Sequence, residues 1–211
     1  MSKIAISWQP GPAAGHEASL LPPGLPHRRF DWQVDPWPTE GGMPEPIMAV
    51  LADVLAAQGP VVGHWAGAPP PHATLFPAPR RGWARRLWDR VLGRWVSDVL
   101  LGTRPATVAL LIDAGWAAEN QVLLALRAGR DPSPAVSLLA QWQDWREVVL
   151  PEVVRVLLLP GADGDSVLMA AADPAELEAL ADALGAAFGE AGWYEKGQGG
   201  AAPQDPHPVP S

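Results

Sequence analysis

The chain has 211 residues, a formal net charge of −8 and no cysteine. Its length is sufficient for one domain with a buried core, and the lack of cysteine excludes disulfides, thiolate metal sites and cysteine nucleophiles. The 25 prolines and 21 glycines require long irregular stretches between the regular elements. Frequent alanine, proline and arginine with only two lysines indicates a bacterial source.

The N-terminal region contains no apolar run of the roughly 7 to 15 residues that a signal peptide needs. No stretch reaches the roughly 18 uncharged apolar residues of a membrane span. We therefore expect a cytoplasmic protein with a single α/β domain over residues 1–194. Residues 195–211 are rich in glycine, proline and glutamine, and such a composition predicts a disordered tail.

The first third of the chain alternates between short regular elements and proline-rich connections. Alternating apolar residues predict a strand over 3–8, and an apolar run closed by a Gly-Pro pair predicts a helix over 46–57. A short strand is expected over 61–65. The proline-rich segments 9–46 and 66–79 show no apolar periodicity, so we interpret both as irregular connections.

The next segment combines arginine and tryptophan in a protein that is acidic as a whole. Apolar pairs recur every four residues from 83 to 100, which predicts an amphipathic helix ending at Gly102. An apolar stripe with a four-residue repeat advances about 40° per repeat around a helix that turns about 100° per residue. The exposed candidates for an interaction are Arg80, Arg81, Arg85, Arg86, Arg90 and Arg94, with Trp83, Trp88 and Trp95.

This segment could contact a protein surface, a membrane surface or nucleic acid. A stripe that moves around the helix favours packing on a core or on a partner protein over lying flat on a membrane, although peripheral membrane contact through 80–100 stays open. The acidic remainder of the chain disfavours nucleic acid. Residues 151–211 hold ten acids and two bases, so we expect one basic and one acidic face.

The middle of the chain carries the strongest architectural signal. A continuous apolar run over 106–113 predicts a buried parallel strand, followed by a helix over 114–128. Residues 135–140 are interpreted as a second strand that runs into a helical turn, with one helix over 135–149 as the alternative. This strand–helix–strand unit predicts an α/β fold with a mostly parallel central sheet flanked by helices.

The C-terminal part predicts a hairpin followed by a helix. Strands are expected over 153–159 and 166–171, because turn residues separate two apolar runs. Asp173, Pro174 and Glu176 occupy the N-cap, first and third positions of the following helix, a pattern typical of helix N-termini.

One pair of residues could carry chemistry at the predicted strand ends. Asp113 ends the predicted parallel strand and His64 lies near the end of its own strand, where open α/β sheets place ligand sites. Such a pair could act as acid and base, although helix capping is the simpler interpretation of Asp113. No recognised catalytic, nucleotide or metal motif is present, so we expect no metal and no cofactor.

The eleven tryptophans are an unusual number, and tryptophan is enriched at protein interfaces. Trp142 and Trp145, among glutamines and an aspartate, resemble a half-exposed interface rim. The sequence therefore predicts a non-catalytic protein–protein interaction protein, such as an accessory subunit, assembly factor or adaptor of a bacterial complex. The alternative is a small α/β enzyme or ligand-binding domain with a site near His64 and Asp113.

Overall fold

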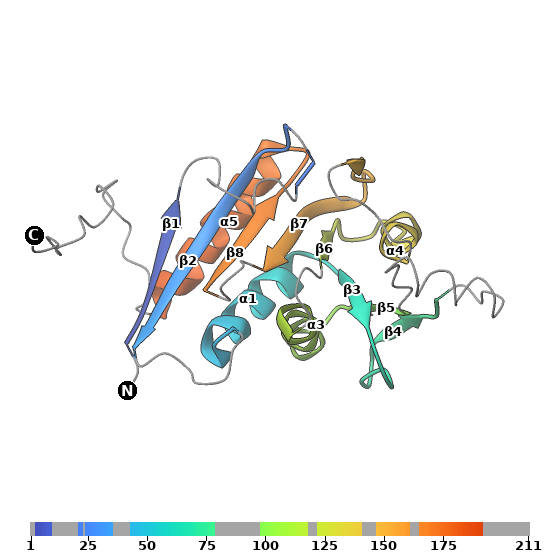
Figure 1. The fold of residues 1–211 in the computed structure, drawn as a ribbon, viewed down its shortest axis with the longest axis horizontal. Coiled ribbons are helices and arrows are strands. Elements are labelled where there is room, and N and C mark those ends of the chain that lie inside the picture. The colour runs from blue at the N-terminus through green and yellow to red at the C-terminus, as the bar shows by residue number, and fades with distance from the viewer. Residues whose placement is uncertain are drawn as a thin grey trace, which may run out of the picture.

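The structure is a computed structural model that describes residues 3–9, 21–22, 24–35, 43–78, 98–117, 122–140, 147–160 and 165–191. Within these ranges the chain forms one sheet and helices that pack on its two faces (Figure 1). In chain order the elements are β1 (Lys3–Gln9), β2 (His27–Asp35), α1 (Glu45–Gln58), β3 (Val61–Trp65), β4 (Thr74–Phe76), β5 (Asp98–Gly102), α3 (Pro105–Ala117), β6 (Leu123–Leu126), α4 (Ser133–Leu139), β7 (Val154–Pro160), β8 (Ser166–Ala170) and α5 (Pro174–Glu190).

The strands form one eight-stranded sheet with the order β1-β2-β8-β7-β6-β3-β5-β4. Every neighbouring pair in this order is antiparallel. The prediction of a mostly parallel central sheet was therefore wrong. That prediction depended on a strand–helix–strand unit beginning at residue 106, and the structure contains no strand there.

The run over 106–113 belongs to helix α3 instead of a strand. Pro105 occupies the first position of this helix, where proline is favoured. Asp113 is the only charged residue of α3. A helix that is apolar on nearly every side has no amphipathic periodicity, so its sequence cannot be distinguished from a buried strand by pattern alone. The helix expected over 114–128 ends at Ala117 in the structure, and β6 occupies part of the remainder.

Four further predictions were wrong about local structure. Residues 27–35 form β2 within the stretch 9–46 that was interpreted as irregular, and residues 74–76 form β4 within the stretch 66–79 that was interpreted in the same way. Residues 133–139 form helix α4, so the strand predicted over 135–140 is absent and the helical alternative over 135–149 is right for residues 135–139. Residues 98–102, the expected end of the arginine-rich helix, form strand β5.

Predictions that depended on strong local signals were confirmed. Helix α1 and strand β3 lie where the sequence places them, and β7 pairs with β8 as the C-terminal hairpin. Asp173 caps α5, because its carboxylate accepts a hydrogen bond of 2.9 Å from the Ala175 N–H. The predicted tail over 195–211 lies outside the described residues.

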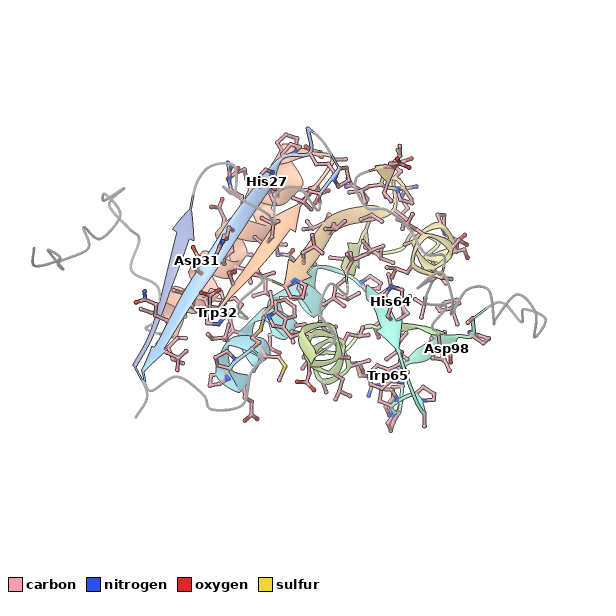
Figure 2. All side chains as sticks on the ribbon, viewed as in Figure 1. His27, Asp31, Trp32, His64, Trp65 and Asp98 are labelled. Carbon is pink, nitrogen blue, oxygen red and sulfur yellow. The ribbon has the colours of Figure 1, made fainter. Side chains whose placement is uncertain are left out.

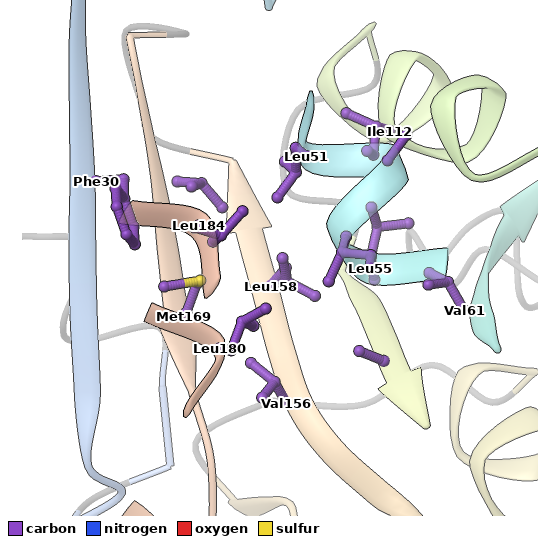
Figure 3. Close-up of a cluster of buried hydrophobic side chains, with 14 of the residues drawn as sticks. Phe30, Leu51, Leu55, Val61, Ile112, Val156, Leu158, Met169, Leu180 and Leu184 are labelled. Atoms are coloured by element: carbon purple, nitrogen blue, oxygen red, sulfur yellow. The ribbon is translucent and has the colours of Figure 1, made fainter. Parts of the chain in front are cut away.

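The sheet separates two apolar cores. Side chains of α1, α3 and α5 pack on one face, which we call the helical face, with residues such as Leu55, Leu111 and Leu184 fully buried. Figure 3 shows part of this core, where Leu51 and Leu55 of α1 approach Leu158 of β7. Helix α4 packs on the opposite face, with its buried residues in a second cluster that includes Leu124 and Leu157. We call this second side the α4 face.

Two glycines let α3 approach the sheet closely. A Cβ atom at Gly63 of β3 would lie 2.6 Å from Leu123 Cδ2 and 3.2 Å from Leu111 Cδ2. At Gly102 of β5 it would lie 2.9 Å from Thr107 Cγ2. Both approaches are shorter than ordinary van der Waals contact, so glycine at these positions sets the distance between α3 and the β3–β5 part of the sheet.

Candidate functional site

The arginine- and tryptophan-rich segment connects two adjacent strands at one end of the sheet. Strand β4 comes before the segment and strand β5 follows it, and Phe76 lies opposite Val99 in their antiparallel register. The Ala78 N–H donates a hydrogen bond of 2.8 Å to Asp98 Oδ1. The residues on either side of 79–97 are thus held together, and the segment starts and finishes at a single point of the sheet.

All the interaction candidates predicted from the sequence lie outside the described residues. These are Arg80, Arg81, Arg85, Arg86, Arg90, Arg94, Trp83, Trp88, Trp95, Trp142 and Trp145. The structure does locate the elements next to them. Trp142 and Trp145 follow α4, which packs against β3, and strand β5, which follows the arginine-rich segment, pairs with β3. Both tryptophan-containing segments therefore begin or end at elements that contact β3.

His64 occupies the centre of this region. Gly63 faces α3 and side chains alternate along a strand, so His64 points to the α4 face. It lies in one cross-strand row with Val99 and Phe76. His64 is half-buried, and burial lowers the pKa of its imidazole below the usual value of 6.5. The ring is therefore neutral near pH 7.

The structure does not bring His64 and Asp113 together. Asp113 lies in α3 on the helical face and its side chain is exposed, whereas His64 points to the α4 face. The sheet lies between the two side chains. Asp113 also lies within the helix and not at its N-cap, so neither the acid–base role nor the capping role proposed for it fits its position.

The connection between β3 and β4 forms a compact turn beside this site. Trp65 Nε1 donates a hydrogen bond of 3.2 Å to the Ala68 carbonyl oxygen. His72 has a φ of 66°, a left-handed backbone conformation that is uncommon for residues other than glycine. Figure 2 shows His64, Trp65 and Asp98 near one another at this end of the sheet, and His27, Asp31 and Trp32 along β2.

Charge is distributed unevenly over the described surface. Helices α1, α3 and α5 contain acidic residues and no arginine, lysine or histidine. Glu176 and Glu178 pair with arginines of the sheet region, and the other acidic side chains are exposed. The full acidic set is Glu45, Asp53, Asp113, Glu176, Glu178, Asp182 and Glu190. The helical face is therefore acidic, in contrast to the six arginines between residues 80 and 94.

A polar cluster around Arg155 joins α1 and α5 to the sheet. Arg155 lies where the register of β6 and β7 shifts, and such a bulge redirects a side chain. Its guanidinium hydrogen-bonds Gln58 of α1 and lies 3.8 Å from Glu176 of α5. Arg127 also pairs with Glu176. Burial lowers the pKa of Arg155 and the Glu176 carboxylate opposes this shift. Sequence analysis missed this cluster because a bulge has no clear sequence signal here.

Another polar cluster joins β2 to α5 and to Asp165, the residue before β8. Arg28 pairs with Glu178 of α5, while Arg29 pairs with Asp31 and lies 3.9 Å from Asp165. These contacts are ion pairs at partly exposed positions, and such pairs typically contribute about 0–1 kcal/mol each to stability. The alternation of Phe30, Trp32 and Val34 in the sequence was the signal that could have revealed β2.

No group of three or more histidine, aspartate or glutamate side chains is placed to hold a metal ion within the described ranges. Among the helices that the structure describes, none has the length and apolar character needed to cross a membrane.

Comparison with known proteins gives no relative for this chain. No family model, no curated protein and no solved structure matches it.

Proposed function

We propose that this protein is a non-catalytic interaction subunit that binds an acidic protein partner through residues 80–95. The observation that carries the proposal is the hydrogen bond between Ala78 and Asp98. It holds together the two residues next to the segment 79–97, and the sequence places six arginines and three tryptophans within that segment.

The residue types of the segment fit this role. Arginine binds carboxylates through two parallel hydrogen bonds and stacks on aromatic rings. Tryptophan supplies a large apolar contact area, and both residue types are enriched among the residues that dominate binding energy. A partner surface that combines exposed carboxylates with apolar side chains would complement both. The roles of accessory subunit, assembly factor or adaptor in a bacterial complex, and a cytoplasmic location, are part of this proposal.

The experiment is a charge reversal with a matched control. Affinity purification from the native host, followed by mass spectrometry, identifies the partner, and its binding is then measured with purified proteins. The double variant Arg85→Glu/Arg90→Glu should weaken binding by at least tenfold, and raised salt should weaken the wild-type complex. The control Arg104→Glu/Arg130→Glu changes the net charge equally at two exposed positions of the described surface and should leave binding unchanged.

Two outcomes would contradict the proposal. Equal binding by the Arg85→Glu/Arg90→Glu variant and the wild type would show that these arginines do not contact the partner. A loss of thermal stability in that variant, with partner binding retained, would instead indicate that the arginines serve the protein's own acidic helices. A double Arg→Lys variant at the same positions separates charge from geometry, because lysine keeps the charge and loses the bidentate contact.

A further inference from the structure

Strand β1 lies at one end of the sheet, and within the described part of the chain only one of its two edges is paired. That edge pairs with β2 from Lys3 opposite Asp35 to Gln9 opposite Arg29. No described strand lies on its outer side. A strand edge of this kind presents a row of backbone N–H and C=O groups that can pair with a further strand.

The opposite end of the sheet is protected against such pairing. Strand β4 has only three residues, and the sequence places prolines at 69–71 before it and at 77 and 79 after it. Short edge strands and flanking prolines both prevent the addition of another strand. Strand β1 is less protected, because it has seven residues, contains no proline between Lys3 and Gln9 and carries no charge after Lys3; the one flanking proline is Pro10, directly after its last residue.

We propose that β1 pairs antiparallel with β1 of a second copy of this chain, so that the two eight-stranded sheets become continuous. Ile4 and Ile6 face the helical core, and Ala5 between them is exposed. A two-fold axis between identical strands allows a register in which apolar residues of the two copies share one face. The central residues 4–6 carry no charge, so no like-charge contact opposes this pairing.

The difference between the two sheet ends favours a second copy of the chain as the partner of the β1 edge. Pairing of two open edges removes both of them in one step. The dimer then ends in a β4 strand on each side, and those edges are short and flanked by proline. Association therefore stops at two copies, as in a closed two-fold assembly. An uncovered seven-residue edge without this pairing would favour aggregation.

This inference is independent of the proposed partner site. Figure 1 shows β1 at one end of the molecule and β4 at the other. The charge reversal at Arg85 and Arg90 would therefore leave the dimer intact, and a change in β1 would leave partner binding intact.

The first test measures the mass of the protein in solution by light scattering over a range of concentrations. The wild type should be a dimer at high concentration and dissociate on dilution. Ala5→Lys places a charge in the middle of each edge, which is a natural means of preventing strand pairing; its dissociation constant should rise at least a hundredfold. Ala5→Thr keeps a neutral side chain suited to a strand and should remain dimeric. Circular dichroism verifies that both variants fold.

The second test locates the interface without disturbing it. The chain contains no cysteine, so a single spin label can be attached through Ala5→Cys or, as control, through Ala106→Cys on the exposed side of α3. Neighbouring strands lie about 4.8 Å apart, so labels at position 5 of the two copies should be within about 20 Å of each other, given the reach of the label. Labels at position 106 should be several times farther apart.

Three results would overturn the inference. The first is a wild type that stays monomeric at its highest soluble concentration. The second is a dimer in which the labels at position 5 are as far apart as those at position 106, or which Ala5→Lys leaves unchanged. The third is an assembly larger than two copies that Ala5→Lys abolishes, because the protected β4 edges would then have failed to end association.

Discussion

The two ends of the sheet are stabilised by different means. At the β1–β2 end, large buried side chains pack against one another. Phe30 and Trp32 of β2 are buried, and the ring centroids of Phe30 and Phe188 of α5 are 6.1 Å apart. At the β4–β5 end, close backbone approach at Gly63 and the hydrogen bond from Ala78 to Asp98 fix the geometry. Both ends belong to the same antiparallel sheet.

This difference indicates that the two ends of the sheet depend on different interactions for their stability. Aromatic packing holds β2 on the core, and the edge strand β1 pairs with β2 along its whole length. At the other end, the edge strand β4 has only three residues, and the hydrogen bond from Ala78 to Asp98 joins the two residues next to the segment 79–97. Stability at the first end should therefore depend on buried apolar area, and stability at the second end on a few polar contacts.

Removal of an aromatic ring from the β1–β2 end should give the largest effect. Phe30→Ala removes a fully buried ring, and such substitutions cost about 3–5 kcal/mol. Urea denaturation measures the free energy of unfolding. The control Gln33→Thr changes an exposed residue of the same strand and should alter stability by less than about 0.5 kcal/mol. A loss below about 1 kcal/mol for Phe30→Ala would remove the basis of the comparison.

An intermediate effect is expected at the β4–β5 end. Asp98→Ala leaves the Ala78 N–H without its carboxylate acceptor, and the loss of a hydrogen bond to a charged group costs about 1–2 kcal/mol at a half-buried position. Amide hydrogen exchange should become faster in β4 and β5 and stay unchanged in β1 and β2. Asp98→Asn retains an oxygen acceptor and should cost less. Equally faster exchange at both ends would show that the two ends are not independent.

The smallest effect concerns the pH dependence that His64 introduces. Because burial lowers the pKa of His64 in the folded protein, the unfolded chain binds more protons near the usual pKa of 6.5. Stability is complete above that pKa and falls as the pH drops below it. His64→Gln removes this contribution, so the stability of the wild type relative to the variant should decrease between about pH 8 and pH 5. Denaturation curves at several pH values measure it. Parallel pH profiles of the two proteins would contradict it.

Much of the fold could be predicted where the signals are local. The cap at Asp173, the turn between β7 and β8, and the Gly59-Pro60 stop after α1 each act over a few residues, and the structure confirmed the elements that they define. Of the candidate site, only His64 and Asp113 lie in the described residues. Their separation by the sheet could not be predicted, because it depends on α3 being a helix.

The sequence by itself determined the composition of the surfaces and the elements with clear periodicity or caps. It placed six arginines and three tryptophans in one segment, and the acids of α5 on a predicted helix. Only the tertiary structure decided that the apolar run at 106–113 is a helix and that β2 joins β1 to β8. The physical reason is that a run that is apolar on all sides fits either state, and burial on the sheet selects the helix. Strand order likewise depends on pairing between residues far apart in the chain, which no local pattern records.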